Sequence, residues 1–190
     1  EAGHAILFHV LPHMDPVYTI SIIPTGMGAA GYTMPLPDND EMFNTKNKML
    51  EDITTLLGGR VAEEIIFGDI TTGASNDIKR ATETARSMVM KYGMSEKIGL
   101  IAYGNDDDEV FIGRDLAHTR GYSEEVAREI DGEISRIIRE CHENAESIIR
   151  ENIGVLHSCA ALLLEKEKIH REEFEALFTT EKEEVAKTNE

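Results

Sequence analysis

Apolar residues recur every three or four positions over most of this chain, which predicts a largely helical protein. The pattern defines six helical segments, three of them long. These segments are 2–11, 46–67, 75–92, 123–151, 155–165 and 171–178. The buried face of the first long helix should carry Met49, Ile53, Leu56, Leu57, Val61, Ile65 and Ile66.

A small sheet is predicted near the N-terminus. Residues 17–23 are rich in β-branched side chains and lie between two prolines, and residues 31–34 form a second short segment of the same kind. Segments 98–103 and 109–113 could add two further short strands. The fold class expected is therefore mainly α, with a small N-terminal β-sheet.

Residues with special backbone preferences support these helix boundaries. Ser75 and Ser123 are expected as N-caps, and Gly68 is placed to end the first long helix. The pair Gly58-Gly59 lies inside that helix, where each glycine costs about 1 kcal/mol relative to alanine. The pair predicts close approach of a neighbouring helix backbone, and a local kink is the alternative.

Composition favours one soluble domain. The chain has 190 residues and a net charge of −17, which argues against nucleic acid or an anionic membrane as a partner. No apolar run approaches the roughly 20 residues that span a bilayer, so no direct membrane contact is expected. We predict one domain over residues 1–178 and a charged, disordered tail over 179–190. Cys141 and Cys159 lie in apolar helical sequence, which predicts buried free thiols in a reducing compartment.

The first residues match part of a metal-binding motif. Glu1-Ala2-Gly3-His4 matches the last four positions of an H-E-x-x-H zinc motif, whose first histidine would precede residue 1. In that motif two histidines one helical turn apart bind Zn²⁺, and the glutamate activates a water molecule. Four residues alone are a weak signal, because helices often carry Glu and His at this spacing without any metal.

A catalytic zinc needs a third protein ligand, which must come from another part of the fold. His9 is out of step with His4 on the helix, and His13 follows a proline that should end it. Carboxylates on the next two helices are better placed. The candidates are Glu63, Glu64 and Asp77.

Each carboxylate also has an ordinary explanation. One of the two glutamates could pair with Arg60 on the same helix while the other faces solvent. Asp77 in a first helical turn is stabilised by the helix dipole whatever its function. The residues alone leave Asp77 and Glu64 about equal as the third ligand.

Four segments occur together in an order and spacing that resemble the peptidase domain of the FtsH family, the membrane-anchored ATP-dependent zinc metalloproteases. The resemblance runs from residue 1 to about 178. The segments are EAGHA at 1–5, GGRVAEE at 58–64, TGASNDI at 72–78 and MSEKIG at 94–99.

This resemblance implies a site and a reaction. It makes Asp77 the third zinc ligand beside His4 and the preceding histidine, with one Zn²⁺ per chain. It makes Glu1 the general base, which takes a proton from a zinc-activated water and passes it to the leaving amine. It also implies that substrate lies along an exposed strand edge, for which the best match is Gly31, Tyr32, Thr33 and Met34.

The resemblance further implies unfolded, damaged or membrane proteins as substrates, a homohexamer, and a place on the cytoplasmic face of a bacterial membrane. ATP would be used by an upstream ATPase domain and not by this chain. Without the first histidine and that ATPase module, we expect zinc occupancy to be low and this fragment to be inactive. The alternative is a non-catalytic oligomerisation module with a vestigial metal site.

Overall fold

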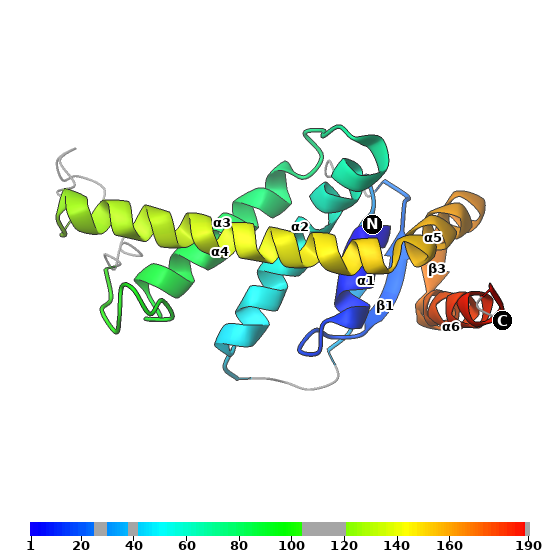
Figure 1. Ribbon diagram of the computed structural model, residues 1–190, viewed down its shortest axis with the longest axis horizontal. Helices are drawn as coiled ribbons and strands as arrows, with labels where there is room; N and C mark the ends of the chain where they lie inside the picture. Colours follow the sequence, from blue (N-terminus) through cyan, green and yellow to red (C-terminus); the bar gives the residue numbers. More distant parts are fainter. Residues whose placement is uncertain (25–29, 38–41, 104–120, 189–190) are drawn as a thin grey trace.

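The computed structural model describes residues 1–24, 30–37, 42–103 and 121–188 of the chain (Figure 1). Helices dominate, as predicted, and a small sheet accompanies them. The helices are α1 (Ala2–Val10), α2 (Lys46–Phe67), α3 (Ser75–Met90), α4 (Glu124–Glu151), α5 (Ile153–Lys166) and α6 (Arg171–Thr188). The strands are β1 (Val17–Ser21), β2 (Tyr32–Pro35) and β3 (Lys168–His170).

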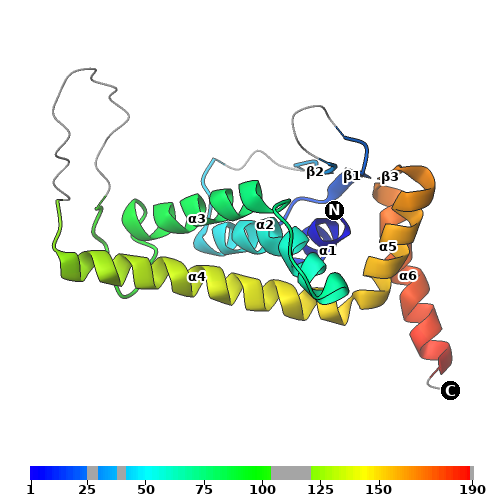
Figure 2. The ribbon, with the colours of Figure 1, turned by 90° about the horizontal axis from the view of Figure 1, so that it is seen from above.

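Helix α4 forms the long base of the molecule. Helices α2 and α3 lie along one side of it, and α5 and α6 extend from its C-terminal end (Figure 2). Helix α1 packs against α2, α4, α5 and β1, so it lies where the helical layer meets the sheet. This central position of α1 leaves Glu1 and His4 partly buried.

The sheet is antiparallel, with strand order β2-β1-β3. Ile20 in β1 pairs with Thr33 on one side and with Ile169 on the other. The two N-terminal strands were predicted, but β3 was not. Because β1 fills the centre, β2 is an edge strand, which is the position that the substrate hypothesis requires.

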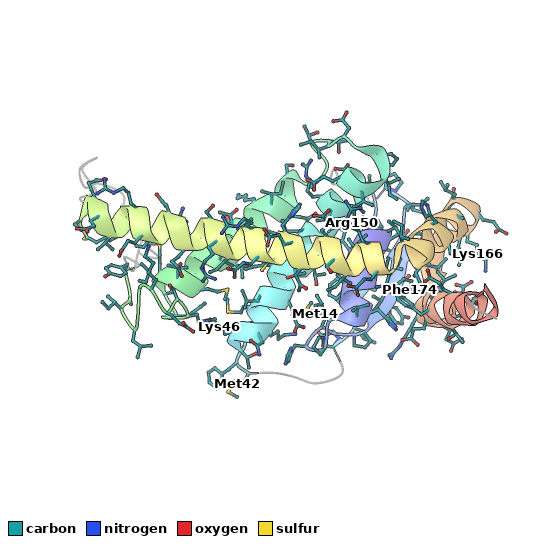
Figure 3. The ribbon with its side chains drawn as sticks, viewed as in Figure 1. Met14, Met42, Lys46, Arg150, Lys166 and Phe174 are labelled. Atoms are coloured by element: carbon teal, nitrogen blue, oxygen red, sulfur yellow. The ribbon has the colours of Figure 1, made fainter. Side chains whose placement is uncertain are left out.

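Two apolar clusters form the core. One gathers α1, β1, β3, α5, α6 and the C-terminal part of α4, and the other joins α2, α3 and the N-terminal part of α4. Phe174 of α6 is fully buried in the first cluster, at the end of the molecule where Lys166 also lies (Figure 3). Cys141 and Cys159 are buried free thiols, as predicted.

The two helices α1 and α2 touch backbone to backbone. A Cβ on Gly3 would lie 2.5 Å from the carbonyl oxygen of Gly58, and a Cβ on Gly58 would lie 3.1 Å from the carbonyl oxygen of Gly3. Only glycine at both positions allows this crossing without displacement. The close approach predicted from the glycine pair is confirmed.

Several helix ends match their predicted chemistry, and one does not. Helix α2 has the predicted bounds, and Gly68 ends it with a φ of 62°. Ser123 caps α4, since its hydroxyl accepts a hydrogen bond from the backbone of Val126. The prediction for Ser75 was wrong, because Ala74 is the N-cap of α3 and the Ser75 N–H donates instead to Thr72 O.

Two other predictions differ from the structure or fall outside it. Residues 98–103 form no strand, and 109–113 lie outside the described residues. The last helix, predicted to end at Phe178, continues to Thr188, so helical backbone reaches into the predicted tail. The domain boundary at residue 178 stays a prediction.

Within the described ranges, no single helix is both long and apolar enough to cross a bilayer. Helices α4 and α5 taken together meet the criteria of length and composition, but they bend by 78° at the break between them.

Candidate metal centre

His4 projects from α1 against the backbone of α2. Its Nδ1 lies 2.7 Å from the carbonyl oxygen of Thr55, so the ring N–H donates there. One turn further along α2, Gly59 faces the other side of the ring, and a Cβ at this position would lie only 2.7 Å from His4 Nε2. The glycine therefore leaves space at the nitrogen that Thr55 does not occupy.

Asp77 approaches that nitrogen from a different helix. It lies in the first turn of α3, and its Oδ2 is 3.7 Å from His4 Nε2. Two ligand atoms that share a tetrahedral zinc at about 2.1 Å each are about 3.4 Å apart. The observed separation is close to that value. The His4 and Asp77 side chains are 16% and 27% exposed, so the pair is sheltered but open to solvent.

The protonation state of His4 favours a cation between the two side chains. Burial, the largest influence, lowers the pKa of His4 below its ordinary value, although Thr55 and Asp77 oppose this shift. A neutral ring that donates from Nδ1 carries a lone pair on Nε2. That lone pair and the Asp77 carboxylate then face each other as two acceptors. A metal ion satisfies such a pair, and a hydrogen bond between them cannot form.

Glu1 lies beside the edge strand β2. The hydroxyl of Thr33 is 2.7 Å from Glu1 Oε2 and donates a hydrogen bond to it. A Cβ on Gly31 would lie 3.0 Å from the Glu1 Cγ and 3.1 Å from its Oε1. The structure thus brings the predicted base and part of the predicted substrate strand into contact.

The competing carboxylates have other partners. Glu64 Oε2 lies 2.8 Å from Nε2 of His142 on α4. Glu63 accepts a hydrogen bond of 2.6 Å from the Thr71 hydroxyl, which lowers the pKa of this glutamate. Arg60 pairs with Glu63, not with Glu64. These contacts favour Asp77 over both glutamates as the partner of His4.

The two later histidines also lie in other environments. His13 Nδ1 is 2.6 Å from Glu51 Oε1, and its backbone N–H donates to the same carboxylate. The His9 ring stacks on Phe178 with centroids 4.1 Å apart. Both observations agree with their low rank as ligands.

The ligand set provided by the described residues is partial. No group of three histidine, cysteine, aspartate or glutamate side chains is arranged around one point there. The distance between His4 and Asp77 is compatible with two ligands of one zinc ion, and Glu1, the N-cap of the same helix α1, contacts Thr33 of β2. A third protein ligand is needed to complete a catalytic zinc centre.

Sequence reasoning did not find the groups that support these residues. The Thr55 carbonyl that orients His4 and the Thr33 hydroxyl that holds Glu1 have no local signature. The space at Gly59 had one signal, the glycine pair inside a long helix.

A helix with a glutamate and a histidine one turn apart, and an aspartate from a second helix 3.7 Å from that histidine, provides part of the donor set of a zinc hydrolase. The family is established by comparison with known proteins. The chain belongs to peptidase family M41, whose model matches residues 1–177.

Similar proteins carry one description. The chain is 54% identical over 181 residues to "ATP-dependent zinc metalloprotease FtsH 1" of Thermoanaerobacter sp. (strain X514), which covers 95% of this chain and 30% of that protein. It is 55% identical over 177 residues to a protein named "ATP-dependent zinc metalloprotease FtsH" from Caldicellulosiruptor bescii, and this match covers 93% of this chain and 29% of that protein. A Thermotoga maritima protein of the same name is 48% identical over 185 residues, covering 97% and 30%. The resemblance to the FtsH family is confirmed, and the chain spans about a third of the length of these relatives.

Proposed function

We propose that this chain is the proteolytic domain of a membrane-anchored, ATP-dependent zinc metalloprotease. The observation that carries the proposal is the pair formed by His4 Nε2 and Asp77 Oδ2, 3.7 Å apart, in a chain of peptidase family M41. The substrates would be unfolded, damaged or membrane proteins. The energy for unfolding them would come from ATP used by an upstream domain, in agreement with the description of the relatives as ATP-dependent.

The residues have separate tasks in this proposal. His4, Asp77 and a histidine directly before Glu1 would hold one Zn²⁺, which when bound supplies Lewis-acid polarisation of the scissile carbonyl and of a water molecule. Glu1 would accept the proton of the attacking water and deliver it to the leaving amine. Thr55 fixes the His4 tautomer through its carbonyl.

Substrate would bind along the edge strand. The free edge of β2 offers main-chain hydrogen bonds to an extended peptide, which allows many different side chains. The strand carries Tyr32, Thr33 and Met34, with Gly31 directly before it. Its contact with Glu1 would bring the peptide bond of a paired substrate towards the base.

The assembly and location are part of the same proposal. The domain would belong to a homohexamer at the cytoplasmic face of a bacterial membrane, with the membrane anchor and the ATPase outside this chain.

The proposal is tested on a chain extended at its N-terminus so that a histidine directly precedes Glu1. We expect near-stoichiometric zinc by mass spectrometry and hydrolysis of casein. Asp77→Ala should lose the zinc, whereas Glu1→Gln should keep the zinc and lose hydrolysis. Glu64→Ala is the matched control, because the Glu64 carboxylate pairs with His142. This variant should keep both the zinc and the hydrolysis of casein.

The alternative is a non-catalytic oligomerisation module. An extended chain that remains folded yet neither binds zinc nor cleaves casein would support this module and refute the enzyme. Loss of zinc from folded Glu64→Ala, with zinc retained in Asp77→Ala, would show that the wrong carboxylate was chosen.

A further inference from the structure

The side of β2 that faces α1 is fitted to Glu1. Residues two apart in extended chain lie on the same face. Thr33 contacts this glutamate, and a Cβ on Gly31, directly before the strand, would lie 2.5 Å from Ser21 O and 3.0 Å from the Glu1 Cγ. Thr33 reaches it with a hydroxyl, and Gly31 leaves the space that its side chain occupies. Met34, on the opposite face, is 42% exposed.

The contact from Thr33 is the kind that fixes a carboxylate. Its Oγ1 lies 2.7 Å from Glu1 Oε2 and 3.2 Å from the Glu1 carbonyl oxygen. A hydroxyl has one proton, and the shorter contact to an ionised acceptor is the stronger hydrogen bond. Threonine is stiff at χ1, so the strand backbone determines where its hydroxyl points. The flexible glutamate side chain therefore takes its orientation from the strand.

We propose that Thr33 is a positioning residue for Glu1, and that it fixes the base relative to the strand on which substrate lies. This inference rests on the proposed function, because it gives Glu1 the role of general base. Strand β2 would have two tasks, since its backbone aligns the peptide and its Thr33 side chain sets the carboxylate beside it. Small errors in the placement of a base reduce the rate steeply.

A purely structural contact would have different consequences. If Thr33 only joined α1 to β2, its loss would reduce stability without a selective effect on turnover. If Thr33 acted through substrate binding, KM would rise instead, although its side chain is not needed for main-chain pairing. A positioning role predicts a lower kcat with KM and zinc content unchanged.

The test compares Thr33→Val, which keeps the shape of the side chain, with Thr33→Ser, which keeps the hydroxyl. Both are made in the chain with a histidine before Glu1. We expect Thr33→Val to lower kcat by about ten- to a hundredfold, with KM changed by less than about twofold. Its zinc content should match the parent, and Thr33→Ser should recover most of the kcat.

A second measurement needs no metal and uses the 190-residue chain itself. Thr33→Val should shift the unfolding equilibrium by about two- to tenfold, the effect of one hydrogen bond. The shift should largely disappear when Glu1→Ala is already present, which measures the coupling of the two side chains.

The positioning role would be overturned if Thr33→Val left kcat unchanged, or if Thr33→Ser were as slow as Thr33→Val. In either case a parent chain that binds zinc and cleaves casein would still support the proposed function. Equal shifts in the unfolding equilibrium with and without Glu1 would also overturn it. A parent that holds no zinc and cleaves nothing would refute the proposed function and this inference together.

Discussion

Gly59→Ala adds one methyl group where the structure leaves too little room for it. The new Cβ would lie 2.7 Å from His4 Nε2, and Cβ atoms in proteins essentially never come closer than 3.0 Å to another heavy atom of this kind. The ring cannot simply move away, because its Nδ1 is held 2.7 Å from Thr55 O on the same face of α2. The substitution therefore acts on the metal-facing nitrogen and on the hydrogen bond that orients the ring.

The magnitude follows from two opposing effects. Overpacking of this kind costs about 1–3 kcal/mol, and replacing glycine by alanine inside a helix returns about 1 kcal/mol. The matched control is Gly132→Ala in α4, where a Cβ meets nothing within 4 Å and only the favourable effect remains. The free energy of unfolding of Gly59→Ala should thus lie about 1–3 kcal/mol below that of Gly132→Ala.

Urea denaturation followed by circular dichroism measures this difference directly. In the chain with a histidine before Glu1, Gly59→Ala should also weaken zinc binding by about ten- to a hundredfold, because the orientation of His4 is disturbed. Gly132→Ala should bind zinc like the parent. Equal stability and equal zinc affinity for the two variants would refute the view that Gly59 clears the metal site.

Two further predictions concern the rest of the fold. Ser95→Ala removes a 2.6 Å hydrogen bond to buried Glu133 and should lower the free energy of unfolding by about 1–2 kcal/mol. Arg136, the main cause, and Ser95 together hold the pKa of Glu133 below its ordinary 4.5. The loss of stability in Ser95→Ala should therefore be complete above pH 4.5 and should shrink as the pH falls through the lowered pKa. A loss of stability that grew on acidification would contradict this assignment. Burial raises the pKa of Cys159 to about 11, so iodoacetamide should label this thiol at pH 8 only after denaturation. Labelling of Cys159 in the native chain, detected by mass spectrometry, would contradict this prediction.

Local sequence determined the helices well because their ends carry local chemistry. The Thr45 hydroxyl accepts from the backbone of Lys48 at the start of α2, and Gly68 supplies the left-handed conformation at its end. Strand β3 has no comparable signal. It exists because Ile169 pairs with Ile20, a partner far away in the sequence, and such pairing is not written in three residues.

The candidate site also has a part that local sequence predicts and a part that depends on distant contacts. Glu1 and His4 lie one helical turn apart, and this spacing predicted a common chemistry only together with the other segments that resemble the FtsH family. The residues alone left Glu64 and Asp77 about equal, and only the family resemblance favoured Asp77. In the fold Glu64 faces His142 and Asp77 faces His4, a difference that depends on tertiary packing. Neighbouring residues on a helix differ by about 100° in direction, and the sequence alone does not say which direction meets α1.

Packing places the His4–Asp77 pair at the boundary between the two apolar clusters. Helix α1 belongs to one cluster and α3 to the other, and both pack on α2. Helix α2 contributes Val61 to the first cluster and Ile53 and Leu57 to the second, so packing on this one helix positions both His4 and Asp77. The separation of 3.7 Å between His4 Nε2 and Asp77 Oδ2 therefore follows from how α1 and α3 pack on α2. A zinc ion bound there would join the two clusters, and its binding free energy would add to the stability of the whole fold.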